Sequence, residues 1–274
     1  AVSDTANAKT ANTTDAPVYV MGIDSGSTST NAVILNGNRE IVASAVIRTG
    51  AKSGESAQRI LEEILQKANL QRSDLTKIVS TGYGRVSIPF ADENVTEISC
   101  HGKGAHYLNP EIRTILDIGG QDSKAIHLNE KGDVTDFVMN DKCAAGTGRF
   151  LEVMANTLSL RPNEMFELAR LGSDTTISSM CTVFAESEVI GLIGKGEPKE
   201  NIAYAVVDST IRKVTAQLSR MNGEMSTFCL TGGLCECEYI REALSKKLGK
   251  EVISSPDARY AGAIGAALSA MKIR

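Results

Sequence analysis

The chain has 274 residues, of which 42% are hydrophobic and 23% charged, and its formal net charge is −4. This composition is ordinary for a soluble globular protein of one or two domains, and the charge argues against a general nucleic-acid or anionic-membrane binder. No stretch approaches the roughly 18 apolar residues that a bilayer span needs and nothing indicates export, so we expect a cytoplasmic protein with no nucleic-acid or membrane partner.

The N-terminal part begins with seventeen residues that are rich in Ala, Thr, Asn and Asp. We expect residues 1–17 to form a disordered tail because they contain no apolar core. The next block is typical of three strands joined by two turns, with apolar runs at 18–23, 32–35 and 41–47. Its first turn combines a carboxylate, a glycine and hydroxyls in the order Asp24-Ser25-Gly26-Ser27-Thr28.

The same pattern occurs again at Asp117, 93 positions after Asp24. There an apolar run at 114–116 precedes Asp117-Ile118-Gly119-Gly120-Gln121-Asp122, and strands are expected over 124–128 and 134–138. A glycine turn lets backbone N–H groups approach a phosphate, and an adjacent carboxylate can hold a metal ion or its water shell. Two such turns facing each other across a cleft predict a site for a nucleoside triphosphate.

Between the two blocks, apolar residues at helical spacing predict an amphipathic helix over 56–69. The glycine turn at 81–85 is interpreted as structural. The pair Cys100-His101 resembles half of a zinc or catalytic site, but no matching second pair accompanies it, so a structural role is favoured. We expect one domain over 18–110 and a second over 111–274.

Six cysteines occur, at positions 100, 143, 181, 229, 235 and 237. Since nothing indicates export, we do not expect these cysteines to form disulfides. Cys143 and Cys181 each stand at the expected start of a helix, where the dipole and free N–H groups stabilise a thiolate. Both are therefore candidate ligands of a soft metal centre, although a buried inert thiol is the alternative for either cysteine alone.

The number of ligands points to a dimer. A [4Fe–4S] cluster usually takes four thiolates, and one chain offers only two cysteines in this setting. A two-fold homodimer supplies four when its axis passes between the helix starts. Cys235 and Cys237, with Cys229 nearby, indicate either a second metal-binding patch or a chance group of half-buried thiols, and we favour the second interpretation.

The C-terminal part completes the nucleotide motifs. A short strand at 228–230 leads into Gly232 and Gly233, where an adenosine could lie against exposed backbone. Helices are expected over 203–221, over 239–248 with a stop at Gly249, and over 261–267, which has small residues at close spacing.

These motifs, in this order, resemble those of the actin, Hsp70 and sugar-kinase superfamily of two-domain ATPases. Three longer segments are more specific: Asp117–Asp122, Asn140–Leu151 and Cys181–Glu188. Together they resemble the BadF/BadG/BcrA/BcrD ATPase family, and within it the activator component of 2-hydroxyacyl-CoA dehydratases, from about residue 18 to the C-terminus.

The resemblance implies an α/β fold of two RNase H-like domains around a nucleotide cleft, with a C-terminal helix that packs back on the first domain. It implies a homodimer with one [4Fe–4S] cluster held by Cys143 and Cys181 of both subunits, and one ATP or ADP in each. The expected activity is ATP-dependent transfer of one electron, taken from ferredoxin or flavodoxin, to a 2-hydroxyacyl-CoA dehydratase.

Within the cleft, Asp24 and Asp117 are assigned to Mg²⁺ or its waters, and Gln121 or Asp122 to orienting the attacking water. The family commonly has a lysine at the position of Asn31, so a charged phosphate contact is missing or comes from elsewhere. The remaining expected nucleotide contacts are Gly26, Ser27, Thr28, Gly119, Gly120, Gly232 and Gly233.

Three other functions stay open. The chain could be the ATPase subunit of a benzoyl-CoA-reductase-like or other low-potential reductase, a small-molecule kinase acting on a sugar, or a scaffold that uses ATP to control assembly. A sugar kinase needs a general base near the γ-phosphate and a polar substrate pocket. Neither a kinase nor a scaffold explains Cys143 and Cys181.

Overall fold

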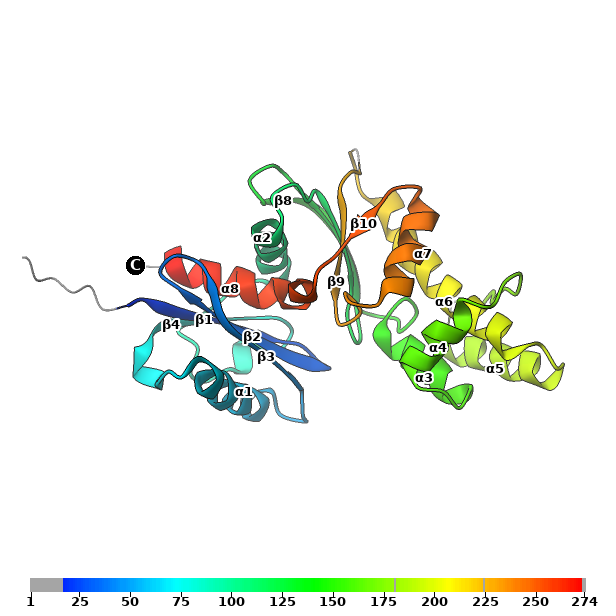
Figure 1. Ribbon diagram of the computed structural model, residues 1–274, viewed down its shortest axis with the longest axis horizontal. Coiled ribbons are helices and arrows are strands. Elements are labelled where there is room, and N and C mark those ends of the chain that lie inside the picture. Colours follow the sequence, from blue (N-terminus) through cyan, green and yellow to red (C-terminus); the bar gives the residue numbers. More distant parts are fainter. Residues whose placement is uncertain (1–16, 180, 224, 273–274) are drawn as a thin grey trace, which may run out of the picture.

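The computed structural model describes residues 17–179, 181–223 and 225–272, so the expected tail lies outside the described residues except for Pro17. Two five-stranded mixed sheets, each flanked by helices, form the molecule (Figure 1). The strand order is β3-β2-β1-β4-β5 in the first sheet and β10-β9-β6-β7-β8 in the second. Both sheets combine antiparallel hairpins with parallel pairs, which agrees with the α/β class expected from the sequence.

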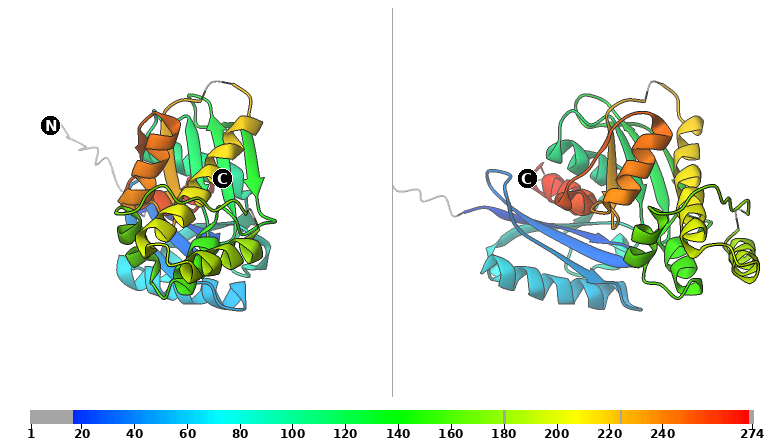
Figure 2. Two further views of the ribbon diagram at one scale, coloured as in Figure 1. Left: turned by 90° about the vertical axis from the view of Figure 1, so that its right-hand side faces the viewer. Right: turned by 45° about the vertical axis from the view of Figure 1, so that its right-hand side comes forward.

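The first sheet is covered by helices on both faces. Along its central strand the side chains alternate, with Met21 and Ile23 packed toward α1 and Val20 toward α8. The two helices accordingly lie on opposite sides of the sheet (Figure 2). The elements are β1 (Tyr19–Ser25), β2 (Ser29–Asn36), β3 (Ile41–Arg48), α1 (Ser53–Ala68), β4 (Leu75–Thr81), β5 (Glu93–Asn94) and α8 (Ala261–Lys272).

The second sheet has one helix on one face and a layer of helices on the other (Figure 1). Its strands are β6 (Thr114–Ile118), β7 (Ser123–Leu128), β8 (Val134–Asn140), β9 (Phe228–Gly232) and β10 (Val252–Ile253). The single helix is α2 (Glu97–Leu108), and the layer consists of α3 (Gly148–Thr157), α4 (Pro162–Ala169), α5 (Thr182–Gly194), α6 (Lys199–Ala216) and α7 (Glu238–Leu248).

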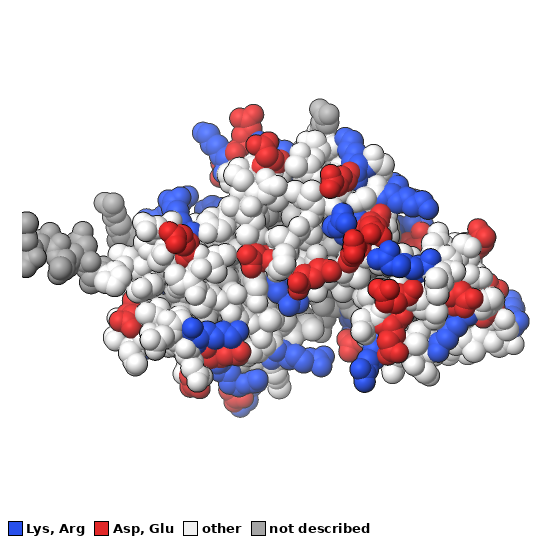
Figure 3. All heavy atoms as spheres, viewed as in Figure 1, with Lys and Arg blue, Asp and Glu red and all other residues white. Residues whose placement is uncertain are grey.

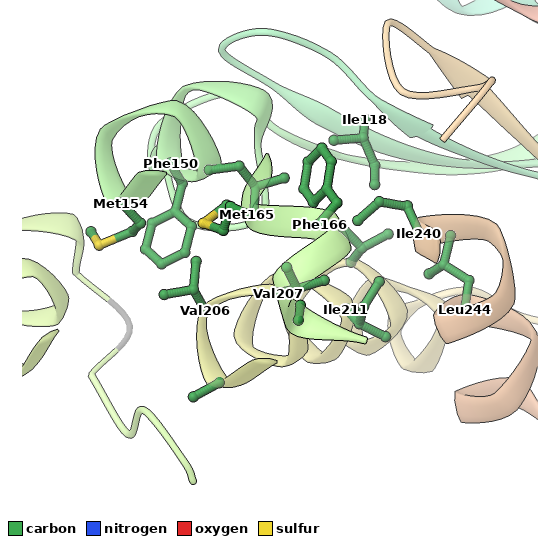
Figure 4. Close-up of a cluster of buried hydrophobic side chains, with 14 of the residues drawn as sticks. Ile118, Phe150, Met154, Met165, Phe166, Val206, Val207, Ile211, Ile240 and Leu244 are labelled. Atoms are coloured by element: carbon green, nitrogen blue, oxygen red, sulfur yellow. The ribbon is translucent and has the colours of Figure 1, made fainter. Parts of the chain in front are cut away.

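The layer of helices is fixed to the end of β6 by a large apolar core. Phe166 of α4 lies next to Ile118 of β6, and Phe150 of α3, Val207 of α6 and Ile240 of α7 belong to the same cluster (Figure 4). Complete burial of a side chain of this size contributes about 1.5–3 kcal/mol. The core therefore holds Asp117, the residue before Ile118, at a well-defined place at the edge of the sheet.

The two predicted hairpins share their turn geometry as well as their sequence pattern. The N–H of Gly26 donates to the carbonyl of Ser29 at 3.0 Å, and 93 positions later the N–H of Gly119 donates to the carbonyl of Asp122 at 2.9 Å. The outer turns match too, because Asn36 and Asn129 each accept two backbone N–H groups on Oδ1. The hairpins are thus equivalent structures, as the sequence predicts.

The other predicted helices agree closely with the structure. The helix expected over 56–69 is α1, and that expected over 239–248 is α7, which is followed by Gly249 with a left-handed φ of 65°. The helix expected over 203–221 begins earlier, at Lys199, and changes to a 3₁₀ turn after Ala216. Helix α2 was not expected from the sequence.

Charged side chains of both signs are mixed over the surface in Figure 3, without a large field of one sign on that face. This distribution agrees with the small net charge of the chain. Among the described residues no helix has the length and apolarity that a membrane crossing requires.

Helices α2 and α8 join the two halves of the molecule through direct backbone contact. A Cβ atom on Gly104 would lie 1.7 Å from the carbonyl oxygen of Ala261, and one on Gly265 would lie 1.7 Å from that of Cys100. Real Cβ atoms do not approach backbone this closely, so only glycine fits at both positions. Because α8 also packs on β1, this contact connects the first sheet to the helix that covers the second.

We predict that Gly265→Ala destabilises the protein by at least about 2 kcal/mol, because its methyl group collides with backbone that cannot rotate away. Gly191→Ala is the control. Gly191 lies inside α5, and a methyl group added there would meet no other atom within 4 Å, so alanine should be neutral or stabilise by about 0.5–1 kcal/mol. Urea unfolding of both variants measures the difference, and equal stability would contradict the close α2–α8 contact.

Candidate functional site

A cleft of about 710 Å³ lies where β1, β6 and β9 end, a volume typical of small-ligand sites. It is lined from both halves of the molecule. Cys143 and Cys181 are not among its lining residues. The cleft does bring together every residue that the sequence assigned to catalysis or nucleotide binding: Asp24, Gly26, Ser27, Thr28, Asp117, Gly119, Gly120, Gln121, Asp122, Gly232 and Gly233.

The carboxylate of Asp117 is fully partnered. Its Oδ1 accepts a hydrogen bond from Thr231 Oγ1 at 2.8 Å and lies 3.1 Å from His101 Nε2, while Oδ2 lies 3.3 Å from Lys124 Nζ. Burial alone would raise the pKa of Asp117, but the charges of His101 and Lys124 and these hydrogen bonds hold it well below its usual range. Asp117 is therefore an ionised, neutralised group of the cleft floor.

Lys124 connects two carboxylates of the second hairpin. Its ammonium lies 3.0 Å from Asp122 Oδ2 in addition to its contact with Asp117, and its side chain is only 7% exposed. Burial opposes its charge, yet the two carboxylates raise its pKa above the ordinary value. Lys124 stands opposite Asp117 in the strand register, as Asn31 stands opposite Asp24 in the first hairpin. Its importance was missed in the sequence, although its place in the repeat indicates it.

The carboxylate of Asp24 is enclosed by glycines. A Cβ atom on Gly82 would lie 2.4 Å from Asp24 Oδ1, and one on Gly262 would lie 2.4 Å from Oδ2. Among the residues that the structure describes, Asp24 has no side-chain hydrogen bond or ion pair, and burial raises its pKa to about 6. An unpaired carboxylate beside a phosphate site fits Mg²⁺, which is held by few protein ligands together with water and phosphate oxygens.

The glycine turn at 81–85 contributes directly to this enclosure. Gly82 has a φ of 89°, which favours glycine, and it is this residue that approaches Asp24. The neighbouring Tyr83 is 80% exposed and lines the cleft. The turn was interpreted as merely structural, but it borders the candidate site.

Helix α2 contributes two further residues to the site: Glu97, which the sequence did not identify, and His101, for which a structural role was favoured. Glu97 and His101, one helical turn apart, both line the cleft, and His101 Nε2 also lies 2.8 Å from Thr231 Oγ1. Successive helical residues point in different directions, so Cys100 is instead buried against α8, where burial raises its pKa to about 11. A purely structural role therefore describes Cys100 but not His101.

The second glycine turn is bonded to the start of α3. The N–H of Gly148 donates to the carbonyl of Gly119 at 2.9 Å, and that of Arg149 donates to the carbonyl of Gly120 at 2.8 Å. These bonds use N–H groups of the first helical turn, which have no partner within the helix. Any displacement of the turn is consequently passed to the helix.

Cys143 lies in a loop before α3 rather than at the helix start. The helix begins at Gly148, and its N-cap is Thr147, whose Oγ1 accepts from the N–H of Phe150. The expected position of Cys143 at a helix N-terminus is therefore wrong. Asn140, at the end of β8, holds the loop by donating from Nδ2 to the carbonyl of Cys143 at 3.1 Å.

Cys181 is the N-cap residue of α5, as expected, and its side chain is exposed. Within residues 17–179, 181–223 and 225–272 no group of three or more His, Cys, Asp or Glu side chains could hold a metal ion. In this part of the chain a metal centre at Cys143 or Cys181 would therefore need additional ligands from outside the subunit.

The three C-terminal cysteines lie on different segments, although Cys229 and Cys235 are close enough to interact electrostatically. Cys229 is buried between β9 and α2, Cys235 has its Sγ 3.9 Å from the carbonyl of Pro256, and Cys237 precedes α7. Burial raises the pKa of all three thiols, to about 12 for Cys229. Protonated thiols are poor metal ligands, which supports the interpretation of these residues as inert.

Comparison with known proteins gives the family of the chain. Residues 21–270 match the BadF/BadG/BcrA/BcrD ATPase family. The chain belongs to this family. It is 44% identical to the (R)-2-hydroxyglutaryl-CoA dehydratase activating ATPase of Acidaminococcus fermentans, over 93% of this chain and 98% of the relative. It is 45% identical to the activator of lactoyl-CoA dehydratase of Anaerotignum propionicum, over 92% and 97%.

Solved structures confirm the fold. The activator of the 2-hydroxyisocaproyl-CoA dehydratase from Clostridium difficile, determined with bound ADPNP, matches with a TM-score of 0.87 and 39% identity over 93% of this chain and 95% of that one. A ROK family glucokinase from Streptomyces griseus matches with a TM-score of 0.56 at 14% identity, over 93% of this chain and 99% of that one, which shows the fold alone. The family and the actin-like, sugar-kinase-like fold drawn from the motifs are thus confirmed.

The two cleft carboxylates predict opposite effects on stability. In metal-free protein at pH 7.5, Asp24→Asn should raise the free energy of unfolding by about 1–3 kcal/mol, because it removes an unpaired, partly buried charge. The folded-state pKa of about 6 exceeds the ordinary 3.8, so this gain should be absent below about pH 4 and complete above about pH 6.

Asp117→Asn should instead destabilise by about 3 kcal/mol near neutral pH, because it removes the partner of Lys124 and His101. Because the pKa of Asp117 is lowered in the folded state, the stability that this carboxylate supplies is lost only as the pH falls below 3.8, the ordinary pKa of an aspartate. Chemical denaturation in the presence of a chelator measures both variants. Equal signs for the two would contradict the assignment of one paired and one unpaired carboxylate.

Proposed function

We propose that this protein is the ATP-dependent activator of a 2-hydroxyacyl-CoA dehydratase and delivers one electron to it through a [4Fe–4S] cluster shared by a homodimer. The family and the activator names of relatives that align over almost their whole length support the activator role. The observation that carries the proposal is the bonding of α3, which follows the Cys143 loop, to the second glycine turn.

The cleft is the proposed site of Mg-ATP. Gly120 and Thr28 approach so closely that a Cβ on Gly120 would lie 2.1 Å from Thr28 Oγ1, so the two turns meet where the phosphates would bind. The assignments of Asp24 and Asp117 to Mg²⁺ or its waters remain predictions, as do those of Gln121 or Asp122 to the attacking water and of Gly232 and Gly233 to the adenosine.

The surface beside Cys181 supports dimer formation. Helix α5 exposes several large apolar side chains, including Val183 and Phe184, each 67% exposed, and Ile190, 56% exposed. A contiguous apolar surface of this kind is typical of protein contacts. A second copy placed on this helix would bring a second Cys181 close to the first, and the proposal requires Cys143 of both copies to reach the same place and complete a set of four thiolates.

A chain of contacts leads from the second glycine turn toward Cys181. From the second glycine turn it runs through α3 to Thr157, whose Oγ1 donates to Glu186 of α5 at 3.1 Å. On the same helix, Glu188 accepts from the backbone N–H groups of Ser178 and Ser179, which precede Cys181. A shift of the turn on nucleotide binding would therefore move α3 and α5 together.

When bound, a [4Fe–4S] cluster supplies a one-electron carrier whose potential depends on charge, hydrogen bonds and solvent exposure. Movement of α3 and α5 would change that surrounding at Cys143 and Cys181. We propose ferredoxin or flavodoxin as the electron source and the dehydratase as the acceptor. A benzoyl-CoA-reductase-like role is less well supported, since the relatives from Acidaminococcus fermentans and Anaerotignum propionicum are named as dehydratase activators.

Replacing Cys143 or Cys181 with alanine should abolish the bound iron, because two ligands of a four-thiolate set disappear from each dimer. Anaerobically purified wild type should be brown and contain about four iron atoms per dimer. Cys235→Ala is the matched control and should keep its iron, since that thiol lies away from Cys143 and Cys181. Loss of iron from the Cys235 variant with retention in Cys143→Ala would move the metal site to the C-terminal cysteines.

ATP dependence of electron transfer tests the function itself. Reduced protein mixed anaerobically with a 2-hydroxyacyl-CoA dehydratase should oxidise only when hydrolysable ATP is present, and ADP alone should leave it reduced. Absorbance of the cluster and the radical signal of the dehydratase follow the reaction. Equal transfer with and without nucleotide would refute the coupling even if ATP binding were demonstrated.

A further inference from the structure

The two halves of the duplicated site have the same backbone but different charges. In each hairpin an aspartate at the end of the first strand stands directly opposite a residue of the second strand: Asn31 opposite Asp24, and Lys124 opposite Asp117. The turns between them have the same hydrogen bond. The first hairpin therefore has the neutral amide of Asn31 at the position where the second has the ammonium of Lys124. The backbone around the two positions is the same.

In the second hairpin, the charge of the aspartate is satisfied by the protein. Both oxygens of Asp117 have partners, namely Thr231 and His101 on Oδ1 and Lys124 on Oδ2. A metal ion would have to displace at least one of these buried partners, and it would have to approach close to the ammonium of Lys124. Both requirements oppose direct metal ligation by Asp117.

In the first hairpin, the aspartate is left without a protein cation. Asn31 is nine-tenths buried, lines the same cleft, and its Oδ1 has no hydrogen-bond partner. Asp24 makes no hydrogen bond or ion pair with the described residues, although Gly82 and Gly262 enclose its carboxylate. Two cationic side chains of the cleft, His101 and Lys124, favour the charged form of Asp24 without bonding to it, and of these only Lys124 belongs to the other hairpin.

We propose that the two hairpins have opposite roles toward the nucleotide: Asp24 alone holds the divalent cation, which replaces the assignment of both aspartates to it, and Lys124, positioned by Asp117 and Asp122, contacts the phosphates. Lys124 thereby supplies the positive charge that the Asn31 position lacks, and Asp117 is a positioning residue. The ligand class is a nucleoside phosphate with one divalent cation. This inference rests on the proposed function, since it requires a nucleotide in this cleft.

Binding of Mn²⁺ to the ADP complex tests the division without relying on turnover. Free Mn²⁺ is measured by electron paramagnetic resonance, and ADP binding is measured separately by calorimetry. Asp24→Asn should weaken Mn²⁺ binding at least about tenfold, whereas Asp117→Asn should change it by less than about threefold. An equal loss in the two variants would overturn the proposal, because both aspartates would then be ligands.

Asn31 provides a second test that leaves both aspartates in place. Asn31→Lys should create an ion pair with Asp24 like that between Lys124 and Asp117, and so weaken Mn²⁺ binding at least about tenfold. Asn31→Met matches the length of lysine without its charge and should bind Mn²⁺ like wild type. Unchanged Mn²⁺ affinity in a folded Asn31→Lys protein would overturn the proposal.

Lys124→Met examines the phosphate contact. It should weaken ADP binding in the absence of metal at least about tenfold, and binding of AMP, which has one phosphate fewer, by a smaller factor. An equal effect on ADP and AMP would refute the contact. If wild-type protein bound neither ADP nor ATP, the proposed function itself would be refuted. If it bound nucleotide but both aspartates proved to be metal ligands, only the division of roles between the hairpins would be refuted.

Discussion

The buried carboxylate of Asp117 is the point at which four elements of the molecule meet. It stands at the end of β6 and is held by Lys124 from β7, Thr231 from β9 and His101 from α2. An unpaired charge in this place would cost several kcal/mol, so the folded state requires all three partners to be in position. The floor of the cleft is therefore organised before any ligand binds, which is the arrangement that favours phosphate chemistry.

This rigid floor has a consequence for the helices beyond it. The second glycine turn is fixed on one side by Asp117 and on the other by bonds from Gly148 and Arg149 to its carbonyls. The turn has few ways to move independently, so a change in what it contacts must be shared with α3. A packed core links α3 to α4 and α6 (Figure 4), so we expect these helices to respond to such a change together.

The parts that could be predicted from the sequence are those encoded by local patterns. Apolar runs and turn residues predicted both hairpins, and a terminal glycine predicted the end of α7. Helix α2 could not be predicted in this way, because Gly102 and Gly104 disfavour a helix in isolation. The sequence pattern does not show that Gly104 contacts the backbone of α8. This contact places His101 in the cleft.

The duplication carries information that neither hairpin carries alone. Judged singly, Lys124 is one polar residue in a strand, and Asn31 is a departure from the family pattern. Because they are 93 positions apart, they occupy equivalent backbone positions of the two hairpins. One position carries a positive charge and the other does not. Two aspartates with identical surroundings would compete for the same cation. Because Asp117 is paired and Asp24 is not, the uncompensated negative charge of the cleft lies on the Asp24 side.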